Sequence, residues 1–271
     1  MKRNDMMLPN LIIIGAMKCG TTSLHEYLNL HPQICMSRVK EPAFFIEEHT
    51  WHKGLDWYRS IFPNPALVMG ESSTSYTKYP TFKGVPERMV SILPDAKLIY
   101  LVRDPVERIV SQYVHMVAYH GENRSIEEAV RGESNDYILY SRYFLQLSKF
   151  LDYYPLERIC IVSFEDLRKD KRKTMCKLFE FLGVDTSFES ERFEQVHNRS
   201  AEKRRPNHLK RLLRNIRGFS RLERHVPWLF NSAIERPRLD ESLKQRLIGA
   251  LHKDIVEFKM VTGLSFDSWC L

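Results

Sequence analysis

The residues best suited to chemistry form one short glycine-rich stretch, residues 15–23, with the sequence GAMKCGTTS. Two glycines bracket a tight loop, a lysine lies inside it, and three hydroxyl side chains follow the second glycine. A loop of this kind at the start of a helix directs backbone N–H groups and the positive end of the helix dipole at one anion. The candidate phosphate-binding residues are Lys18, Cys19, Gly20, Thr21, Thr22 and Ser23.

The loop departs from the nucleoside triphosphate loop, G-x-x-x-x-G-K-[ST], at one informative position. Gly15 and Gly20 have the right spacing, but Thr21 stands where that motif has its lysine, and the lysine of this loop is Lys18. A P-loop nucleotide kinase or NTPase that uses ATP therefore remains an alternative. A nucleotide-binding protein without catalytic activity is a second alternative.

Candidate acid–base groups occur in three other segments. Glu41 follows a lysine, Lys40, and precedes a proline and two phenylalanines, an environment that we expect to raise its pKa towards the working range. Glu71 follows an apolar run, and we expect it near the site, where it could orient Lys18 or the substrate. His115 is the third candidate base.

These motifs together resemble the sulfotransferases that use 3′-phosphoadenosine 5′-phosphosulfate, PAPS, and release PAP. The resemblance implies that residues 15–23 bind the 5′-phosphosulfate and that Lys18 neutralises charge on the leaving phosphate. The segment K-E-P-x-F-F at residues 40–45 matches the one that carries the catalytic glutamate in the heparan-sulfate glucosaminyl sulfotransferases. By this resemblance Glu41 is the catalytic base, and Lys40 and Glu71 are candidate substrate contacts.

A second phosphate motif follows a later apolar run. Arg103 begins an R-D-P turn, and Ser111 lies eight residues further on, which matches the sulfotransferase pair that binds the 3′-phosphate. A guanidinium and a hydroxyl are suited to phosphate oxygens. The alternative for Arg103 is an ion pair with Asp104 or Glu107.

Other family features are less well matched. Arg199 and Ser200 resemble a segment near the nucleotide, but the K-G-R element of the glucosaminyl enzymes is absent, and Arg204, Arg205 and Pro206 could stand in for it. Those enzymes also have a lysine where this chain has Ser72, a departure that puts the carry-over of their sugar specificity in doubt. The acceptor is expected to be a small molecule or a saccharide, sulfated on a hydroxyl or an amine.

The elements that must position these residues follow from apolar runs. Buried strands are expected at residues 11–14, 33–36, 66–70, 97–102 and 159–164, the uninterrupted apolar pattern of a parallel sheet. Helices are expected after the first loop, over 51–62, from 105, and over 137–151, 208–225 and 241–262. We predict one domain over residues 1–271, a three-layer α/β fold with a central parallel sheet of about five strands flanked by helices, similar to the P-loop NTPases.

Composition excludes several classes of protein. The chain has 271 residues and a net charge of +7, which favours anionic ligands, but it carries no nucleic-acid-binding signature. Five scattered cysteines, no secretory signal and no membrane-length apolar run indicate a cytoplasmic protein, and no metal-ligand spacing is present. The basic segment 208–225 could contact an acidic partner or an anionic membrane, or it could flank the substrate cleft.

Overall fold

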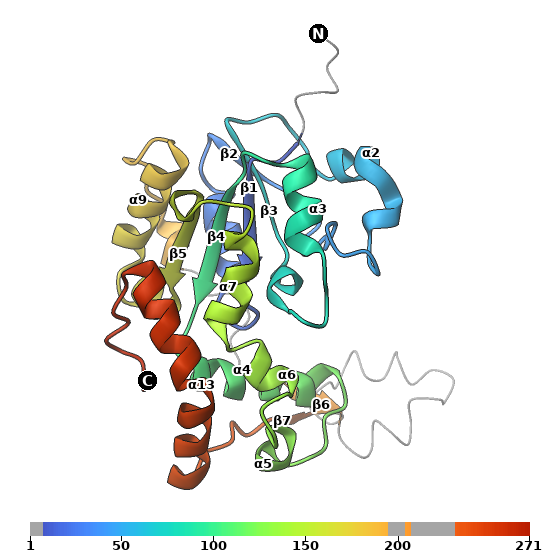
Figure 1. The fold of residues 1–271 in the computed structure, drawn as a ribbon. Helices are drawn as coiled ribbons and strands as arrows, with labels where there is room; N and C mark the ends of the chain where they lie inside the picture. Colours follow the sequence, from blue (N-terminus) through green and yellow to red (C-terminus); the bar gives the residue numbers. More distant parts are fainter. Residues whose placement is uncertain (1–7, 195–203, 207–230) are drawn as a thin grey trace.

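The computed structural model describes residues 8–194, 204–206 and 231–271, and its core is a five-stranded parallel sheet (Figure 1). The strand order is β2-β3-β1-β4-β5. This arrangement confirms the three-layer α/β fold expected from the sequence. The strands are β1 (Leu11–Gly15), β2 (Ile34–Met36), β3 (Val68–Ser72), β4 (Lys97–Val102) and β5 (Ile159–Ser163).

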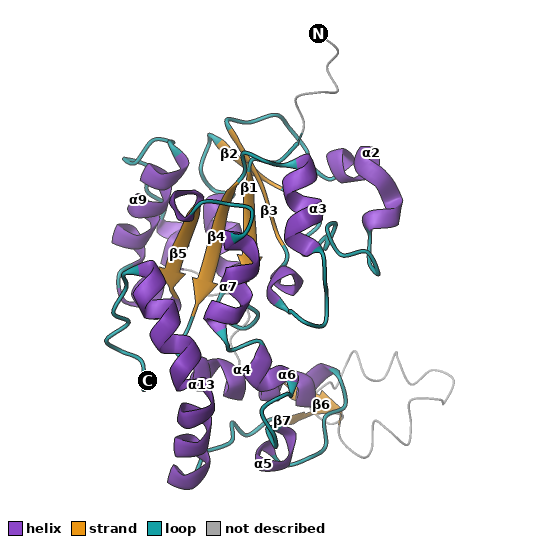
Figure 2. Cartoon of the chain, viewed as in Figure 1, coloured by secondary structure: helices purple, strands orange, loops and turns teal. Residues whose placement is uncertain are grey.

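Helices flank the sheet on both sides (Figure 2). Those of the first half are α1 (Thr21–Leu28), α2 (Gly54–Ser60), α3 (Val85–Ile92) and α4 (Pro105–Tyr119). Those of the second half are α5 (Ile126–Ala129), α6 (Asp136–Leu139), α7 (Tyr143–Leu151), α8 (Phe164–Lys169), α9 (Lys171–Leu182) and α13 (Glu241–Thr262). Short 3₁₀ turns are η1 (Trp51–Lys53), η2 (Thr74–Thr77), η3 (Leu156–Arg158) and η4 (Glu191–Glu194), and a small antiparallel pair joins β6 (Arg204–Pro206) to β7 (Asn231–Ala233).

The order of the strands decides where a ligand can bind. The chain fills one side of β1 with β2 and β3, and then crosses to the other side to add β4 and β5. In an open parallel sheet, ligands bind outside the carboxyl ends of the strands at such a reversal. The reversal lies between β1 and β4, which places the glycine-rich loop and the R-D-P turn side by side.

The third strand ends later than its apolar run predicts. β3 extends to Ser72, and Glu71 and Ser72 pair in register with Ile12 and Ile13 of β1. Both polar residues are fully buried, with hydrogen bonds to other side chains. Hydropathy alone ends the strand too early, because it cannot show that these polar groups find partners inside the protein.

The helix expected over 137–151 is two helices, α6 and α7, separated by a break at residues 140–142. The guanidinium of Arg108 donates to the carbonyl of Tyr137 at 2.7 Å. In a continuous helix that carbonyl would accept the N–H of Ser141. The competing bond from a distant arginine therefore explains an interruption that no local signal in the sequence indicates.

The other helix expectations that fall on described residues hold with small changes at their ends, whereas the one over 208–225 lies outside the described residues. The segment 51–62 begins as the 3₁₀ turn η1 and continues as α2, while α4 begins at Pro105 and α13 spans the expected 241–262. Tyr58 is fully buried and stacks on Phe44 with 4.1 Å between ring centroids, so it belongs to the core. Within the described part of the chain, no helix is both long enough and apolar enough to cross a membrane.

Candidate active site

The glycine-rich loop joins β1 to α1, and close packing dictates both of its glycines. A Cβ on Gly15 would lie 2.0 Å from Oγ1 of Thr77, whose hydroxyl donates to the carbonyl of Ile14. Gly20 has φ +96°, and a Cβ there would lie 2.9 Å from the ring of Phe164. A residue larger than glycine would displace η2 if it stood at position 15, and α8 if it stood at position 20. With glycine at both positions, the loop keeps its backbone conformation at the N-terminus of α1.

The residues of this loop lie at the start of α1, in differing degrees of burial. Lys18 has φ +71°, a left-handed conformation that is costly for a side chain and concentrates at functional sites. Thr21 and Ser23 are buried in the first turn of α1, while Thr22 is partly exposed. Burial raises the pKa of the Cys19 thiol to about 11, so this residue is neutral near pH 7.

Glu41 lies on a tight turn that the end of β3 holds in place. Its φ is +58°, and its backbone N–H donates to the carbonyl of Ser72 at 2.9 Å. The N–H of Ala43, also left-handed at φ +50°, donates to Oγ of Ser73 at 2.9 Å. The hydroxyl of Thr74 donates to Oε2 of Glu41 at 3.0 Å. Hydroxyl residues after β3 thus fix the candidate base, a role that the sequence did not reveal.

The expectation that aromatic neighbours raise the pKa of Glu41 is wrong. Burial acts in that direction, but Lys40 forms an ion pair with Oε1 at 2.9 Å, and Thr74 and the charge of Lys78 favour the ionised form as well. Together they lower the pKa of Glu41 below its usual value. Glu41 is therefore a carboxylate at neutral pH, ready to accept a proton but weaker as a base than expected.

Glu71 is the carboxyl group whose pKa is raised. It is fully buried, and its oxygens accept hydrogen bonds from Tyr76 at 2.6 Å, Ser73 at 2.9 Å and Tyr58 at 3.4 Å. Burial raises the pKa of Glu71 to about 7 despite these donors. Since Ser73 also accepts the N–H of Ala43, Glu71 supports the turn that carries Glu41.

Ser72 occupies the position where the glucosaminyl enzymes have a lysine, and its side chain faces α1. Its hydroxyl lies 2.9 Å from Nδ1 of His25, which is buried. Burial and the charge of Lys40 lower the pKa of His25 to about 4, so the ring is neutral at pH 7. The cations near Glu41 are therefore Lys40 and Lys78.

Arg103 forms the ion pair that the sequence left as its alternative. Its guanidinium donates to Oε2 of Glu107 at 2.9 Å and lies over the ring of Phe164, 4.9 Å from the centroid. Within the described part of the chain, its Nε is buried without a hydrogen-bond partner. An arginine that holds one exposed carboxylate and keeps a buried unsatisfied donor is suited to a phosphate that replaces the carboxylate.

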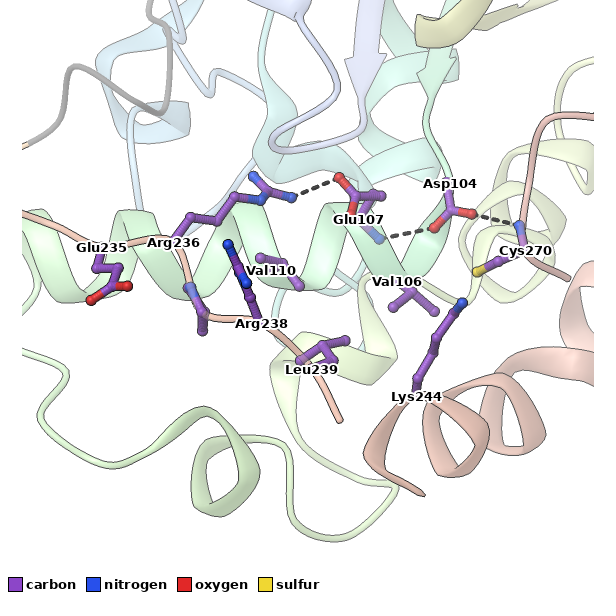
Figure 3. Close-up of a pocket in the computed structure, with 11 residues that line it drawn as sticks. Asp104, Val106, Glu107, Val110, Glu235, Arg236, Arg238, Leu239, Lys244 and Cys270 are labelled. Atoms are coloured by element: carbon purple, nitrogen blue, oxygen red, sulfur yellow. Dashed lines mark hydrogen bonds and ion pairs between the residues drawn. The ribbon is translucent and has the colours of Figure 1, made fainter. Parts of the chain in front are cut away.

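A second arginine reaches the same carboxylate from the other end of the chain. Arg236 donates to Oε2 of Glu107 at 2.6 Å (Figure 3), and the same oxygen accepts a hydrogen bond from Nη2 of Arg103. Beside this contact is a cavity of about 610 Å³ whose lining includes Arg238 and Lys244. Sequence reasoning missed Arg236, and its only signal was a pair of arginines flanking a proline just before the last helix.

The structure places the other candidates as follows. Ser111 lies on α4 and is buried, and His115 lies one turn further along the same helix, partly exposed. Arg204 lies in β6, which packs near α4, but its side chain is outside the described part of the chain. Arg199, Ser200 and the basic segment 208–225 also fall outside the described residues. Within residues 8–194 and 231–271, no cluster of His, Cys, Asp or Glu is arranged to hold a metal ion.

Comparison with known proteins identifies a family for this chain. The sulfotransferase domain family matches residues 8–236. The human bifunctional heparan sulfate N-deacetylase/N-sulfotransferase 2 is 31% identical over 199 residues, covering 65% of this chain and 22% of that protein. The mouse heparan sulfate glucosamine 3-O-sulfotransferase 3B1 is 33% identical over 189 residues, covering 65% of this chain and 46% of that protein. The chain spans less than half the length of these two relatives.

A solved structure shows the same fold. A sulfotransferase from Alicyclobacillus acidocaldarius superposes with a TM-score of 0.73 at 24% identity, over 97% of this chain and 98% of that one. The family match covers most of the chain, and both phosphate motifs lie at the reversal of the sheet. The chain therefore belongs to the PAPS-dependent sulfotransferase family.

Proposed function

We propose that this chain transfers the sulfuryl group of PAPS to a hydroxyl or amine of an acceptor and releases PAP. One observation supports this most strongly: two separate phosphate-binding motifs, the loop at Lys18 and the turn at Arg103, flank the reversal between β1 and β4. PAPS carries phosphate groups at both its 5′ and 3′ ends, so it needs two such sites. An ordinary nucleoside triphosphate needs only the first.

The residues present fit the two ends of this nucleotide. Loop N–H groups, Lys18, Thr21 and Thr22 would hold the 5′-phosphosulfate, which supplies the sulfuryl group for transfer. Arg103 and Ser111 would hold the 3′-phosphate. We add Arg236, because it already shares an anionic oxygen with Arg103. Glu107 would then serve as the counter-ion that keeps both guanidinium groups in place before the nucleotide binds.

Glu41 and Lys18 have the chemical properties that sulfuryl transfer requires. Glu41 is ionised at neutral pH and partly exposed, and it would accept the proton of the acceptor hydroxyl or amine. Lys18 would stabilise negative charge on the departing phosphate oxygen. Both residues have left-handed backbones, the kind of strained conformation that concentrates at functional sites.

For the acceptor we propose a saccharide, as the names of the heparan sulfate relatives suggest. Two lysines near Glu41 support an acceptor with negative groups of its own: Lys40 forms the ion pair, and the charge of Lys78 lowers the pKa of Glu41. Ser72 stands where those enzymes have a lysine, so the proposal does not specify which position of the sugar is sulfated. A panel of glucosaminyl oligosaccharides beside neutral phenols, with PAPS as donor, tests this class.

The nucleotide assignment can be tested without knowing the acceptor. PAP, AMP, ADP and ATP with Mg²⁺ are compared by calorimetry, and PAP is expected to bind most tightly. Arg103→Ala should weaken PAP by roughly ten- to a hundredfold and leave AMP nearly unchanged, since charged hydrogen bonds contribute about 1.5–3 kcal/mol each. An equal loss for PAP and AMP would contradict the role of Arg103, and tighter binding of ATP would favour the kinase alternative.

A further inference from the structure

Arg108 is a fully buried arginine on α4, directly behind the glycine-rich loop. Its Nη1 donates to the carbonyl of Met17 at 3.5 Å, and its Nε donates to Oγ of Ser141 at 2.6 Å. Its Nη2 donates to Oε1 of Gln112 and to the carbonyl of Tyr137, both at 2.7 Å. Every acceptor is neutral, and within the described residues no carboxylate pairs with Arg108.

The titratable groups around Arg108 do not balance its charge either. Those that interact with it most are Tyr143, Cys19, Tyr100 and Tyr140. Burial raises the pKa of each of these groups, to about 11 for Cys19 and about 12 for Tyr140. All four are neutral at pH 7, so none of them balances the guanidinium, and the charge of Arg108 also lowers the pKa of a second cation, Lys78. A buried charge without a counter-ion is costly unless something compensates it.

The contact with Met17 links this charge to the loop. The peptide bond between Met17 and Lys18 is trans, so its N–H points in the direction opposite to its C=O. Because Arg108 holds the carbonyl, the N–H of Lys18 turns away from Arg108. The same contact fixes the peptide that begins the left-handed residue Lys18. Arg108 therefore acts on the loop in two ways. Its hydrogen bond orients one peptide group, and its positive charge produces an electrostatic field at the loop.

We propose that Arg108 is the buried counter-charge of the anion bound by the glycine-rich loop, and a positioning residue for Lys18. The proposal rests on the function proposed above, in which that anion is the 5′-phosphate end of the nucleotide. Arg103 and Arg108 then act on opposite ends of the nucleotide. Arg103 recognises the 3′-phosphate, and Arg108 acts on the 5′-phosphate from behind the loop without needing to touch it.

The test compares PAP with adenosine 3′-monophosphate, which lacks the 5′-phosphate. Dissociation constants of both ligands are measured by calorimetry at one fixed salt concentration. Arg108→Gln should weaken PAP by about tenfold or more, as expected for loss of one nearby buried charge, and leave adenosine 3′-monophosphate nearly unchanged. The matched control is Arg88→Gln, because Arg88 also donates to a backbone carbonyl, that of Phe45 at 2.8 Å, but lies on α3.

A second variant keeps the arginine and cancels its charge. Gln112→Glu places a carboxylate where Oε1 of Gln112 now accepts from Arg108 at 2.7 Å. This variant should also lower the preference for PAP over adenosine 3′-monophosphate. Gln112→Met adds no charge, so its preference for PAP should stay close to that of wild type. If Arg108→Gln does not fold, Gln112→Glu by itself still tests the proposal.

Two possible results distinguish failure of the role of Arg108 from failure of the proposed function. A folded Gln112→Glu or Arg108→Gln protein that prefers PAP as strongly as wild type would overturn the role of Arg108 and leave the proposed function intact. A wild-type protein that binds PAP no better than adenosine 3′-monophosphate would overturn both, because the loop would then hold no 5′-phosphate. Loss of PAP preference in both variants, but not in Arg88→Gln and Gln112→Met, supports the proposal.

Discussion

Two carboxyl groups at the end of β3 have opposite properties. Glu41 is partly exposed, pairs with Lys40, and has a lowered pKa. Glu71 is fully buried among tyrosine and serine hydroxyls, and its pKa is raised to about 7. Ser73 and the turn at Ala43 connect the two. The comparison shows that burial raises the pKa of both carboxyls, and that Lys40, Thr74 and Lys78 outweigh this effect at Glu41 alone.

The largest effect should come from removing the ionised member of this pair. Glu41→Gln is expected to lower kcat by about 10²–10⁴, the usual contribution of a positioned base, and to keep PAP affinity. Glu71→Gln should cost less, since that group is buried, and His115→Ala less again. Steady-state rates with a saturating acceptor give the order. Near wild-type turnover by Glu41→Gln, with an inactive Glu71→Gln or His115→Ala, would contradict our assignment of the base.

The next effect concerns stability and its dependence on pH. The unfolded chain has the ordinary glutamate pKa of 4.5, and the folded protein has about 7 at Glu71, so unfolding releases a proton between these values. The contribution of Glu71 is therefore most favourable below pH 4.5 and is lost as the pH rises to 7, by about 3 kcal/mol. Glu71→Gln should remove this loss.

Urea unfolding at pH 5 and pH 8 measures this difference. The quantity of interest is wild type minus Glu71→Gln at each pH, because Asp254, whose pKa burial raises to about 6, contributes a change of the same sign to both proteins. Glu47→Gln, at an exposed position, serves as the control. An equal difference at the two pH values would show that the pKa of Glu71 is not raised.

A smaller effect should follow from removing the counter-ion of Glu41. Lys40→Met should raise the pKa of Glu41 and move the acidic limb of the kcat/KM profile to higher pH. The Glu41 side chain is 41% exposed, so the shift should not exceed about 1 pH unit, as for surface ion pairs of about 0.2–1 kcal/mol. Lys53→Met, which removes a lysine stacked on Trp57, should leave the profile in place.

The smallest effect should come from the neutral donor to Glu41. Thr74→Val removes one hydrogen bond of 3.0 Å to Oε2 and should shift the acidic limb in the same direction as Lys40→Met, but less. If Thr74→Val shifted the limb more than Lys40→Met, hydrogen bonding rather than the ion pair would control the ionisation of Glu41.

The sequence alone determined the features that depend on neighbouring residues. The apolar run before Gly15, the loop to Ser23 and the turn from Arg103 to Pro105 each combine a strand and a helix start within a short segment. Local spacing therefore predicted the five-stranded sheet, the family and the two phosphate motifs. The same reasoning chose Glu41 as the base, an assignment that remains a prediction.

Only the tertiary structure decided the features that depend on distant residues. Arg236 meets Arg103 through Glu107, and Arg108 binds the carbonyl of Tyr137 in α6, before the helix break at residues 140–142. The opposite pKa shifts of the two glutamates depend in the same way on partners brought together by folding. Burial and the distance between charges set such properties, and both are defined only once the chain is packed.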